Sequence, residues 1–215
     1  MNDWTISNKT LLIYRIVFMI LSWFTIIASA VIYAVTIGPI LDWFNSFKAF
    51  TMQTNLIVTI WFTLAILWYN KPETLDKISG PLKGAFTLYI TITFVFFAIF
   101  LSPFYQPTGF AAFSNLVLHY ITPIAFIVDW ILTEIKEQYK WKYLLYWITY
   151  PLCYMIFAVI HGTITGNYLY YFFDISALGI LEFVVFISIL IAIGIALGCM
   201  YIAINRKRVI QQYVE

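Results

Sequence analysis

Six long apolar stretches, separated by short segments with helix breakers, constrain this chain more than any other feature of its sequence. The hydrocarbon core of a bilayer is about 30 Å thick, so an α-helix needs about 20 mostly apolar residues to cross it. We expect six such helices, over residues 10–37, 50–69, 84–102, 112–132, 143–161 and 176–205. The pattern predicts an all-α polytopic membrane protein, built as a bundle of six transmembrane helices.

The composition favours the same class of protein. Hydrophobic residues make up 63% of the 215 residues and charged residues only 10%, whereas soluble domains average about 45–50% and about 25%. Six spans with short loops leave no length for a soluble domain, so we expect one transmembrane domain over residues 1–215. The first apolar stretch is too long for a cleaved signal peptide, because it continues past Ala28-Ser29-Ala30 as far as Ile37.

The distribution of Lys and Arg predicts the orientation in the membrane. Eleven of the 12 cationic residues fall in the N-terminal flank, the second and fourth loops and the tail: Lys9, Arg15, Lys71, Lys77, Lys83, Lys136, Lys140, Lys142, Arg206, Lys207 and Arg208. The loops on the opposite side contain only Lys48. Because basic loops stay in the cytoplasm, we expect a multi-pass protein of the cell membrane with both termini cytoplasmic.

Polar side chains inside apolar helices are costly in hydrocarbon and are therefore candidates for a functional site. With the expected topology, such side chains from four helices lie in the outer half of the bundle: Thr51, Asn55, Asn115, His119, His161 and Glu182. Thr51 and Asn55 are four residues apart and share a helix face, as do Asn115 and His119. Glu182 is expected about two turns deep and facing the bundle interior. The clustering in one half of the membrane indicates a site.

The fourth expected span carries two further features. Pro123 follows His119 by four residues and has no N–H to donate to the His119 carbonyl, so we expect a kink there. Asp129 stands apart, near the cytoplasmic end of this span, and is expected to reach toward Lys136 in a structural role.

Structural roles stay open for several of the polar residues. Asn55 and Asn115 can serve as interhelical hydrogen-bonding groups, which are common in membrane bundles. His161 lies at the end of the fifth expected span, where it can be an interfacial residue, and Glu182 can pair with a polar neighbour.

Several other kinds of site are not expected. The two cysteines, Cys153 and Cys199, lie in apolar stretches without His or Cys at ligand spacing, so we predict neither a disulfide nor a metal site. The chain has no P-loop and no Rossmann fingerprint, and it has no basic amphipathic stripe for nucleic acid. We therefore expect no cofactor and no nucleic-acid partner.

Short motifs in four regions resemble those of a known family. Phe50-Thr51 opens the second span, His119 precedes Pro123 in the fourth, and His161 precedes Thr165-Gly166 and the run Tyr170-Tyr171-Phe172-Phe173. Over nearly the whole chain, this pattern resembles the androgen-induced-protein-like family of membrane threonine hydrolases, and especially its prokaryotic six-span branch. The eukaryotic members cleave fatty-acid esters of hydroxy fatty acids with one Thr and one His. The resemblance implies Thr51 as the nucleophile and His119 as its catalytic partner.

This implied chemistry makes demands on the neighbouring residues. A threonine hydroxyl is a weak nucleophile and needs a base within hydrogen-bond reach. The oxyanion of the intermediate needs hydrogen-bond donors, for which the candidates are Gln53, Asn55 and Asn115. Glu182 lies at a depth compatible with orienting the histidine. Membrane lipids or fatty-acyl esters would reach such a site laterally from the outer leaflet.

Two classes of function stay open on the sequence. The first is a membrane-embedded esterase, which requires Thr51 and His119 to lie within reach of each other. The second is a non-enzymatic membrane protein, such as a small transporter, a channel or a regulatory partner, whose polar residues hold the bundle or line a pathway. A pathway needs polar groups toward both sides of the membrane, and Asp129 is its candidate in the inner half.

Overall fold

Among the residues that the structure describes, six helices are long and apolar enough to cross a membrane. The structure, a computed structural model, describes residues 7–71, 74–75, 80–135 and 138–210. The six helical spans cover Asn8–Thr36, Phe50–Leu67, Gly80–Phe104, Gly109–Thr133, Tyr143–Thr165 and Ile180–Lys207. No strand occurs in the described ranges. The prediction of an all-α polytopic protein with six spans is confirmed.

The ends of the last two spans differ from the expected ones for a local reason. The fifth span continues to Thr165, rather than ending near residue 161, and stops where Gly166 adopts a left-handed conformation with φ of +72°. The sixth span begins at Ile180, rather than near residue 176, because Gly179 (φ +84°) separates it from a preceding short helix. Both glycines adopt a backbone conformation that other residues rarely take.

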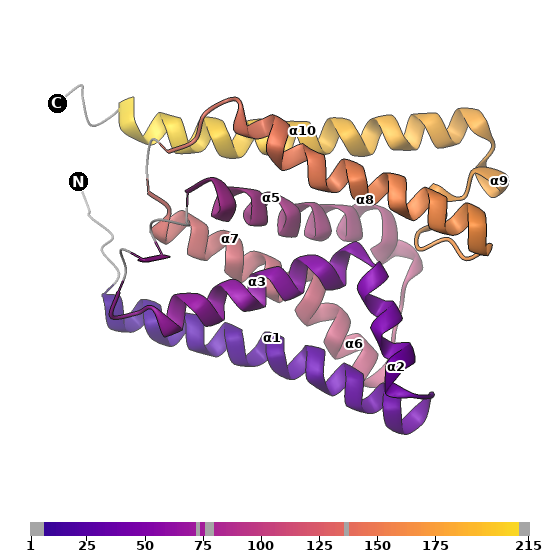
Figure 1. Cartoon of the computed structure of the whole chain (residues 1–215), viewed down its shortest axis with the longest axis horizontal. Coiled ribbons are helices and arrows are strands. Elements are labelled where there is room, and N and C mark those ends of the chain that lie inside the picture. Colours follow the sequence, from indigo (N-terminus) through magenta and orange to yellow (C-terminus); the bar gives the residue numbers. More distant parts are fainter. Residues whose placement is uncertain (1–6, 72–73, 76–79, 136–137, 211–215) are drawn as a thin grey trace. The chain divides into compact units, whose positions relative to one another are not determined.

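The chain forms two compact units, which we describe separately. Figure 1 labels the helices of the chain. The first unit contains residues 1–47 and 51–134, and the second contains residues 48–50 and 135–215. The first unit includes the α-helices α1 (Asn8–Thr36), α2 (Ile40–Trp43), α3 (Phe50–Leu67), α5 (Gly80–Phe96), α6 (Gly109–Leu116) and α7 (Thr122–Thr133). The first residue of α3, Phe50, belongs to the second unit. The second unit includes α8 (Tyr143–Thr165), α9 (Ile175–Leu178) and α10 (Ile180–Ile210). The single domain expected over the whole chain stays a prediction.

The core of the first unit joins α3, α5 and α7. Its fully enclosed residues are Val58, Trp61, Phe62, Ile90, Ala125 and Phe126. Lipid is as apolar as these side chains, so the hydrophobic effect does not drive such helices together. Close packing and interhelical hydrogen bonds hold them instead. Hydroxyl groups supply several of these bonds, such as Thr54 to Thr93 at 2.8 Å and Ser22 to Thr122 at 3.1 Å.

Two wide, π-helical turns interrupt the spans of the first unit. One covers Phe97–Leu101 at the end of α5, and the other, η4, covers Val117–Ile121 between α6 and α7. In η4 the Thr122 N–H donates to the Val117 carbonyl, one residue further back than in an α-helix. The interruption expected at Pro123 therefore takes the form of a π turn that ends just before it. Such turns occur frequently at functional sites.

The second unit is held by polar contacts as well as by the packing of α8 against α10. Asn205 of α10 accepts from the Tyr139 N–H at 3.2 Å and donates to the Ile135 carbonyl at 3.0 Å. In the short helix α9, the Asp174 carboxylate caps the first turn by accepting from the Ser176 and Ala177 amides. The Ser176 hydroxyl also donates to Asp174, and these bonds hold the pKa of that carboxyl below its ordinary value.

Candidate functional site

Thr51 and His119, which lie 68 residues apart in the chain, meet in the first unit. Thr51 is the second residue of α3, and His119 is the central residue of the π turn η4. The Thr51 Oγ1 atom lies 3.2 Å from His119 Nε2, within hydrogen-bond distance. Both residues are half-buried. The structure thus brings together the two residues that the sequence analysis placed at the centre of a candidate site.

The second ring nitrogen of His119 indicates its protonation. His119 Nδ1 lies 3.2 Å from the Asn115 carbonyl oxygen, one helical turn back. A carbonyl oxygen can only accept a hydrogen bond, so the Nδ1 atom carries the hydrogen. In a neutral histidine, Nε2 is then an acceptor, and it faces the Thr51 hydroxyl. This tautomer is the one that a general base toward Thr51 requires.

An aromatic ring fixes the plane of this histidine. The buried Phe97 stacks on His119 with ring centroids 3.7 Å apart and an interplanar angle of 19°. Phe97 is the first residue of the π turn at the end of α5, so the two wide turns of the unit meet at this contact. The histidine can therefore change neither its ring plane nor its Nδ1 contact without disturbing a packed neighbour.

Asn55 ties the two halves of the pair together. Its Nδ2 group donates to the Thr51 carbonyl and to the Leu118 carbonyl, both at 2.9 Å. These bonds connect the first turn of α3 to the residue before His119. Both amide hydrogens are engaged, so in this arrangement Asn55 has none to give to an oxyanion. Gln53, another predicted donor, uses its Nε2 to bind the Phe47 carbonyl at 2.7 Å.

Asn115 differs from these two side chains. Its Oδ1 atom is buried and has no hydrogen-bond partner among the described residues. We also find no hydrogen bond from its Nδ2 atom in the part of the chain that the structure describes. A buried polar atom without a partner costs about 1–3 kcal/mol, which is tolerated where a ligand supplies the partner. Of the three predicted donors, Asn115 is the one whose amide group is not already engaged.

The other two predicted site residues, His161 and Glu182, belong to the second unit. His161 lies one turn before the end of α8, and its Nδ1 atom is buried without a hydrogen-bond partner among the described residues. Glu182 is exposed, so the expectation that it faces the interior two turns deep is wrong. Because α10 begins only at Ile180, Glu182 lies in the first turn, where the positive end of the helix dipole favours a carboxylate.

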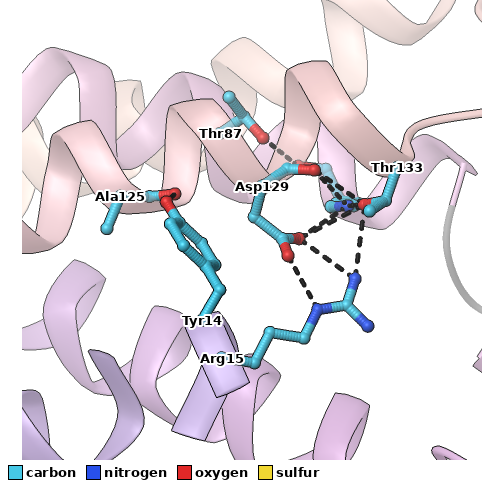
Figure 2. Close-up of polar contacts among 7 residues, drawn as sticks. Tyr14, Arg15, Thr87, Ala125, Asp129 and Thr133 are labelled. Atoms are coloured by element: carbon cyan, nitrogen blue, oxygen red, sulfur yellow. Dashed lines mark hydrogen bonds and ion pairs between the residues drawn. The ribbon is translucent and has the colours of Figure 1, made fainter. Parts of the chain in front are cut away.

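Three charged residues form a second polar region in the first unit that the sequence analysis missed (Figure 2). Asp129 of α7 binds Arg15 of α1, with Oδ1 2.7 Å from Nε, and Lys83 of α5, with Oδ2 2.9 Å from Nζ. We call these three residues the ion cluster. They are 0%, 8% and 2% exposed respectively. The expected partner of Asp129, Lys136, lies outside the described residues.

A signal for the ion cluster was present in the sequence. Arg15 falls inside the first predicted span and Asp129 inside the fourth, and opposite charges within spans tend to pair. In the predicted orientation, Arg15 and Lys83 count only as flanking charges. Thr133 completes the cluster, since its Oγ1 donates to the Asp129 carbonyl at 2.7 Å and accepts from Arg15 and Lys83. The cluster therefore links three helices.

No group of three or more His, Cys, Asp or Glu side chains that could hold a metal ion occurs within the described ranges. The candidate site consists of the Thr51–His119 pair with its supporting amides, and the ion cluster is a separate region of the same unit. Compared with models of known protein families, with curated proteins and with solved structures, the chain matches none of them.

Proposed function

We propose that this protein is an intramembrane threonine hydrolase that cleaves long-chain acyl esters, with Thr51 as the nucleophile and His119 as the general base. The observation that carries the proposal is the 3.2 Å contact of Thr51 Oγ1 with His119 Nε2, while Nδ1 is held by the Asn115 carbonyl. A nucleophile, a base within reach and a group that orients the base are the parts that covalent catalysis needs. The resemblance to the androgen-induced-protein-like hydrolases supports the same pair.

The reaction follows from these positions. Thr51 Oγ1 attacks the ester carbonyl carbon while its proton passes to His119 Nε2, giving a tetrahedral oxyanion. The oxyanion collapses to an acyl-threonine ester, and the leaving alkoxide takes the proton from His119. Water then attacks the acyl-threonine with His119 again as the base, which releases the fatty acid and restores the Thr51 hydroxyl.

Two groups can stabilise the oxyanion. Thr51 is the second residue of α3, so its backbone N–H has no acceptor within the helix, and the helix dipole favours negative charge at this end. The amide of Asn115 is the second donor, once its carboxamide turns its nitrogen toward the substrate. Removing one oxyanion donor typically costs about 10²–10³-fold in rate.

The surroundings of the pair favour a lipid substrate. Phe113 and Leu116, on the helix turns that precede His119, are 37% and 50% exposed. Apolar side chains exposed on a membrane span face acyl chains, so an ester with a long acyl chain can approach from the lipid. The substrate class that we propose is therefore a fatty-acyl ester. The family resemblance implies fatty-acid esters of hydroxy fatty acids in particular.

The transport form of the non-enzymatic alternative loses the group on which it relied. A pathway through the bundle would use Asp129 as its polar group in the inner half of the membrane. The Asp129 carboxylate instead binds Arg15 and Lys83 and is fully buried. No contact of the described residues favours transport over hydrolysis.

A serine-hydrolase probe tests the proposal. We expect a long-chain fluorophosphonate to label the purified protein in detergent. Thr51→Ala should abolish the labelling because the attacking oxygen is gone, and His119→Ala should strongly reduce it. Thr51→Ser keeps the hydroxyl and should keep the labelling, as should the control Thr149→Ala, which removes an exposed threonine of α8. A wild-type protein that takes no label and hydrolyses no long-chain acyl ester would refute the esterase.

We also propose that the protein lies in the cell membrane with both termini in the cytoplasm. Arg15 and Lys83 are paired inside the spans, but the remaining basic residues of the flanks and loops still outnumber Lys48. After Cys153 and Cys199 are replaced by Ser, cysteines introduced at Thr108 and Asn167 should react with an impermeant maleimide added from outside. A cysteine at Gln138 should not react, and labelling there would refute the orientation.

A further inference from the structure

The ion cluster contains more positive than negative charge. Lys83 Nζ contacts three acceptors, namely Asp129 Oδ2 at 2.9 Å, the Asp129 carbonyl at 3.4 Å and Thr133 Oγ1. These three acceptors match the three N–H donors of a lysine ammonium group. Arg15 is always charged in proteins. Two cations therefore share one carboxylate.

This excess charge needs a counter-ion. Each of the three side chains is nine-tenths or more buried, and a buried charge without a partner is strongly unfavourable. Within the described part of the chain, both ion pairs of these cations are made with Asp129. A second negative charge at this position would balance the cluster.

One edge of the Arg15 guanidinium is open to receive that charge. Its Nε and Nη2 atoms bind Asp129, at 2.7 and 3.4 Å, while Nη1 points away from the carboxylate (Figure 2). Nη1 makes no hydrogen bond within the described ranges, and it is not among the fully buried polar atoms that lack a partner. It therefore keeps some contact with the surroundings. A guanidinium edge suits phosphate oxygens, because it presents parallel N–H groups in a plane.

The cluster lies near one end of all three helices that build it. Arg15 is seven residues from the first residue of α1, Lys83 three from the first of α5, and Asp129 four from the last of α7. At 1.5 Å per residue these separations are about 10, 5 and 6 Å. This depth is close to the headgroups, on the side where the basic loops of the sequence lie.

We propose that the ion cluster binds the phosphate group of an anionic phospholipid in the leaflet next to the basic loops. Arg15 Nη1 contacts a phosphate oxygen, and the Lys83–Asp129 ion pair holds the guanidinium in place. Basic sites between transmembrane helices on the cytoplasmic side are a recurrent way of binding such headgroups. The lipid here is a bound ligand and takes no part in the hydrolysis, so this site is independent of the Thr51–His119 pair.

Thermal unfolding in detergent, with added lipid, tests the site. A ligand at about 100 times its dissociation constant should raise the melting temperature of a protein of this size by about 5–10 °C. We expect phosphatidylglycerol to produce such a shift and phosphatidylcholine, which has no net charge, to produce a much smaller one. Inorganic phosphate has no acyl chains and should have no effect. If it reproduces the full shift, the ligand is a soluble anion and the lipid assignment is wrong.

Variants of α1 distinguish lipid binding at the ion cluster from a general effect of positive charge on the protein. Arg15→Gln leaves a neutral Lys83–Asp129 pair, so the shift with phosphatidylglycerol should disappear. Lys9→Gln removes an exposed charge from the same helix and should keep the full shift. If Arg15→Gln does not fold, Arg15→Lys keeps the ion pair but loses the outward edge, and its shift should be reduced. An equal response of wild type and the folded Arg15 variant, or of the two lipids, would overturn the proposal.

Discussion

The first unit of this protein contains two polar regions within membrane-spanning helices, and they differ in charge and in burial. The Thr51–His119 pair is neutral and half-buried, and the two asparagine side chains beside it each have a buried Oδ1 atom without a hydrogen-bond partner among the described residues. The ion cluster is charged and almost fully buried, and its carboxylate binds two cations. Each region includes residues of the same span, Gly109–Thr133, together with residues of other helices.

Because of this difference, substitutions in the two regions should affect different properties, namely activity and stability. A neutral hydroxyl and a neutral imidazole can be removed without leaving a charge behind in the membrane, so the loss should appear in activity and hardly in stability. Removing the carboxylate of the ion cluster leaves two buried cations without a partner, so the loss should appear in stability. Three predictions test whether the two regions divide in this way, and a fourth concerns a reference carboxylate outside both of them.

The largest effect should be on the hydrolytic activity of the Thr51–His119 pair. Thr51→Ala and His119→Ala should each lower the rate of long-chain ester hydrolysis by about 10³-fold or more, and the double variant should be little worse. The melting temperatures should stay close to wild type, because no buried charge is exposed. Rates that fall independently in the two single variants and multiply in the double variant would show that the residues do not act as a unit.

The next effect concerns the stability of the ion cluster. Asp129→Asn keeps the size of the side chain but removes its charge, and breaking a buried ion pair in this way costs about 3–5 kcal/mol. Denaturant unfolding in mixed micelles measures this loss, and the folded fraction should still be labelled by the fluorophosphonate. Asp42→Asn, at an exposed carboxylate of α2, is the control and should change little. A stable Asp129→Asn protein would remove the distinction between the two regions.

Asn55 should show a smaller effect on both quantities. Asn55→Ala removes the bonds to the Thr51 and Leu118 carbonyls and leaves the Leu118 carbonyl without its partner, which should cost about 1–3 kcal/mol. The hydrolysis rate of the folded protein should fall as well, because Thr51 and His119 are no longer tied together. An unchanged rate with reduced stability would mean that Asn55 acts only as an interhelical hydrogen bond.

The smallest effect is expected at Asp174, an exposed carboxylate that serves as a reference for Asp129. Its pKa is depressed below the ordinary value of 3.8 by the Ser176 hydroxyl and the two capped amides. A depressed pKa means that the cap stabilises α9 fully above about pH 3.8 and that this contribution is lost as the pH falls through the lower, folded-state value. Hydrogen exchange of the Ser176 and Ala177 amides measures this loss. After correction for the intrinsic exchange rate, the exchange should become faster below that pH. The Asp174→Asn variant should show no such pH dependence.

The sequence predicted the spans well because hydropathy and length decide which helices can cross a membrane. It also identified Thr51 and His119 as candidate site residues, because their expected depths in two different spans agree and the family resemblance implies both. It could not reveal which side chains of different helices touch. The two hydrogen bonds of the Asn55 side chain and the partners of Asp129 depend on how the helices are rotated and packed. The spacing of residues within one helix carries no such information.

The error at Glu182 has a different origin. Its expected depth followed from a helix that begins near residue 176, whereas Gly179, with φ of +84°, separates α9 from α10, which begins one turn later. A shift of one turn moves a side chain by about 5 Å along the helix axis. Depth assigned from sequence is therefore only as good as the assigned first residue of the helix.

The π turn Val117–Ile121 has one consequence for the relation between the two polar regions. A π turn accommodates one more residue than an α-helical turn, and one residue corresponds to a rotation of about 100°. The turn therefore sets the angular phase between His119, which faces α3, and Asp129, which faces α1 and α5. A one-residue deletion between these two positions would restore a regular helix, and that helix could present either residue to its partners but not both.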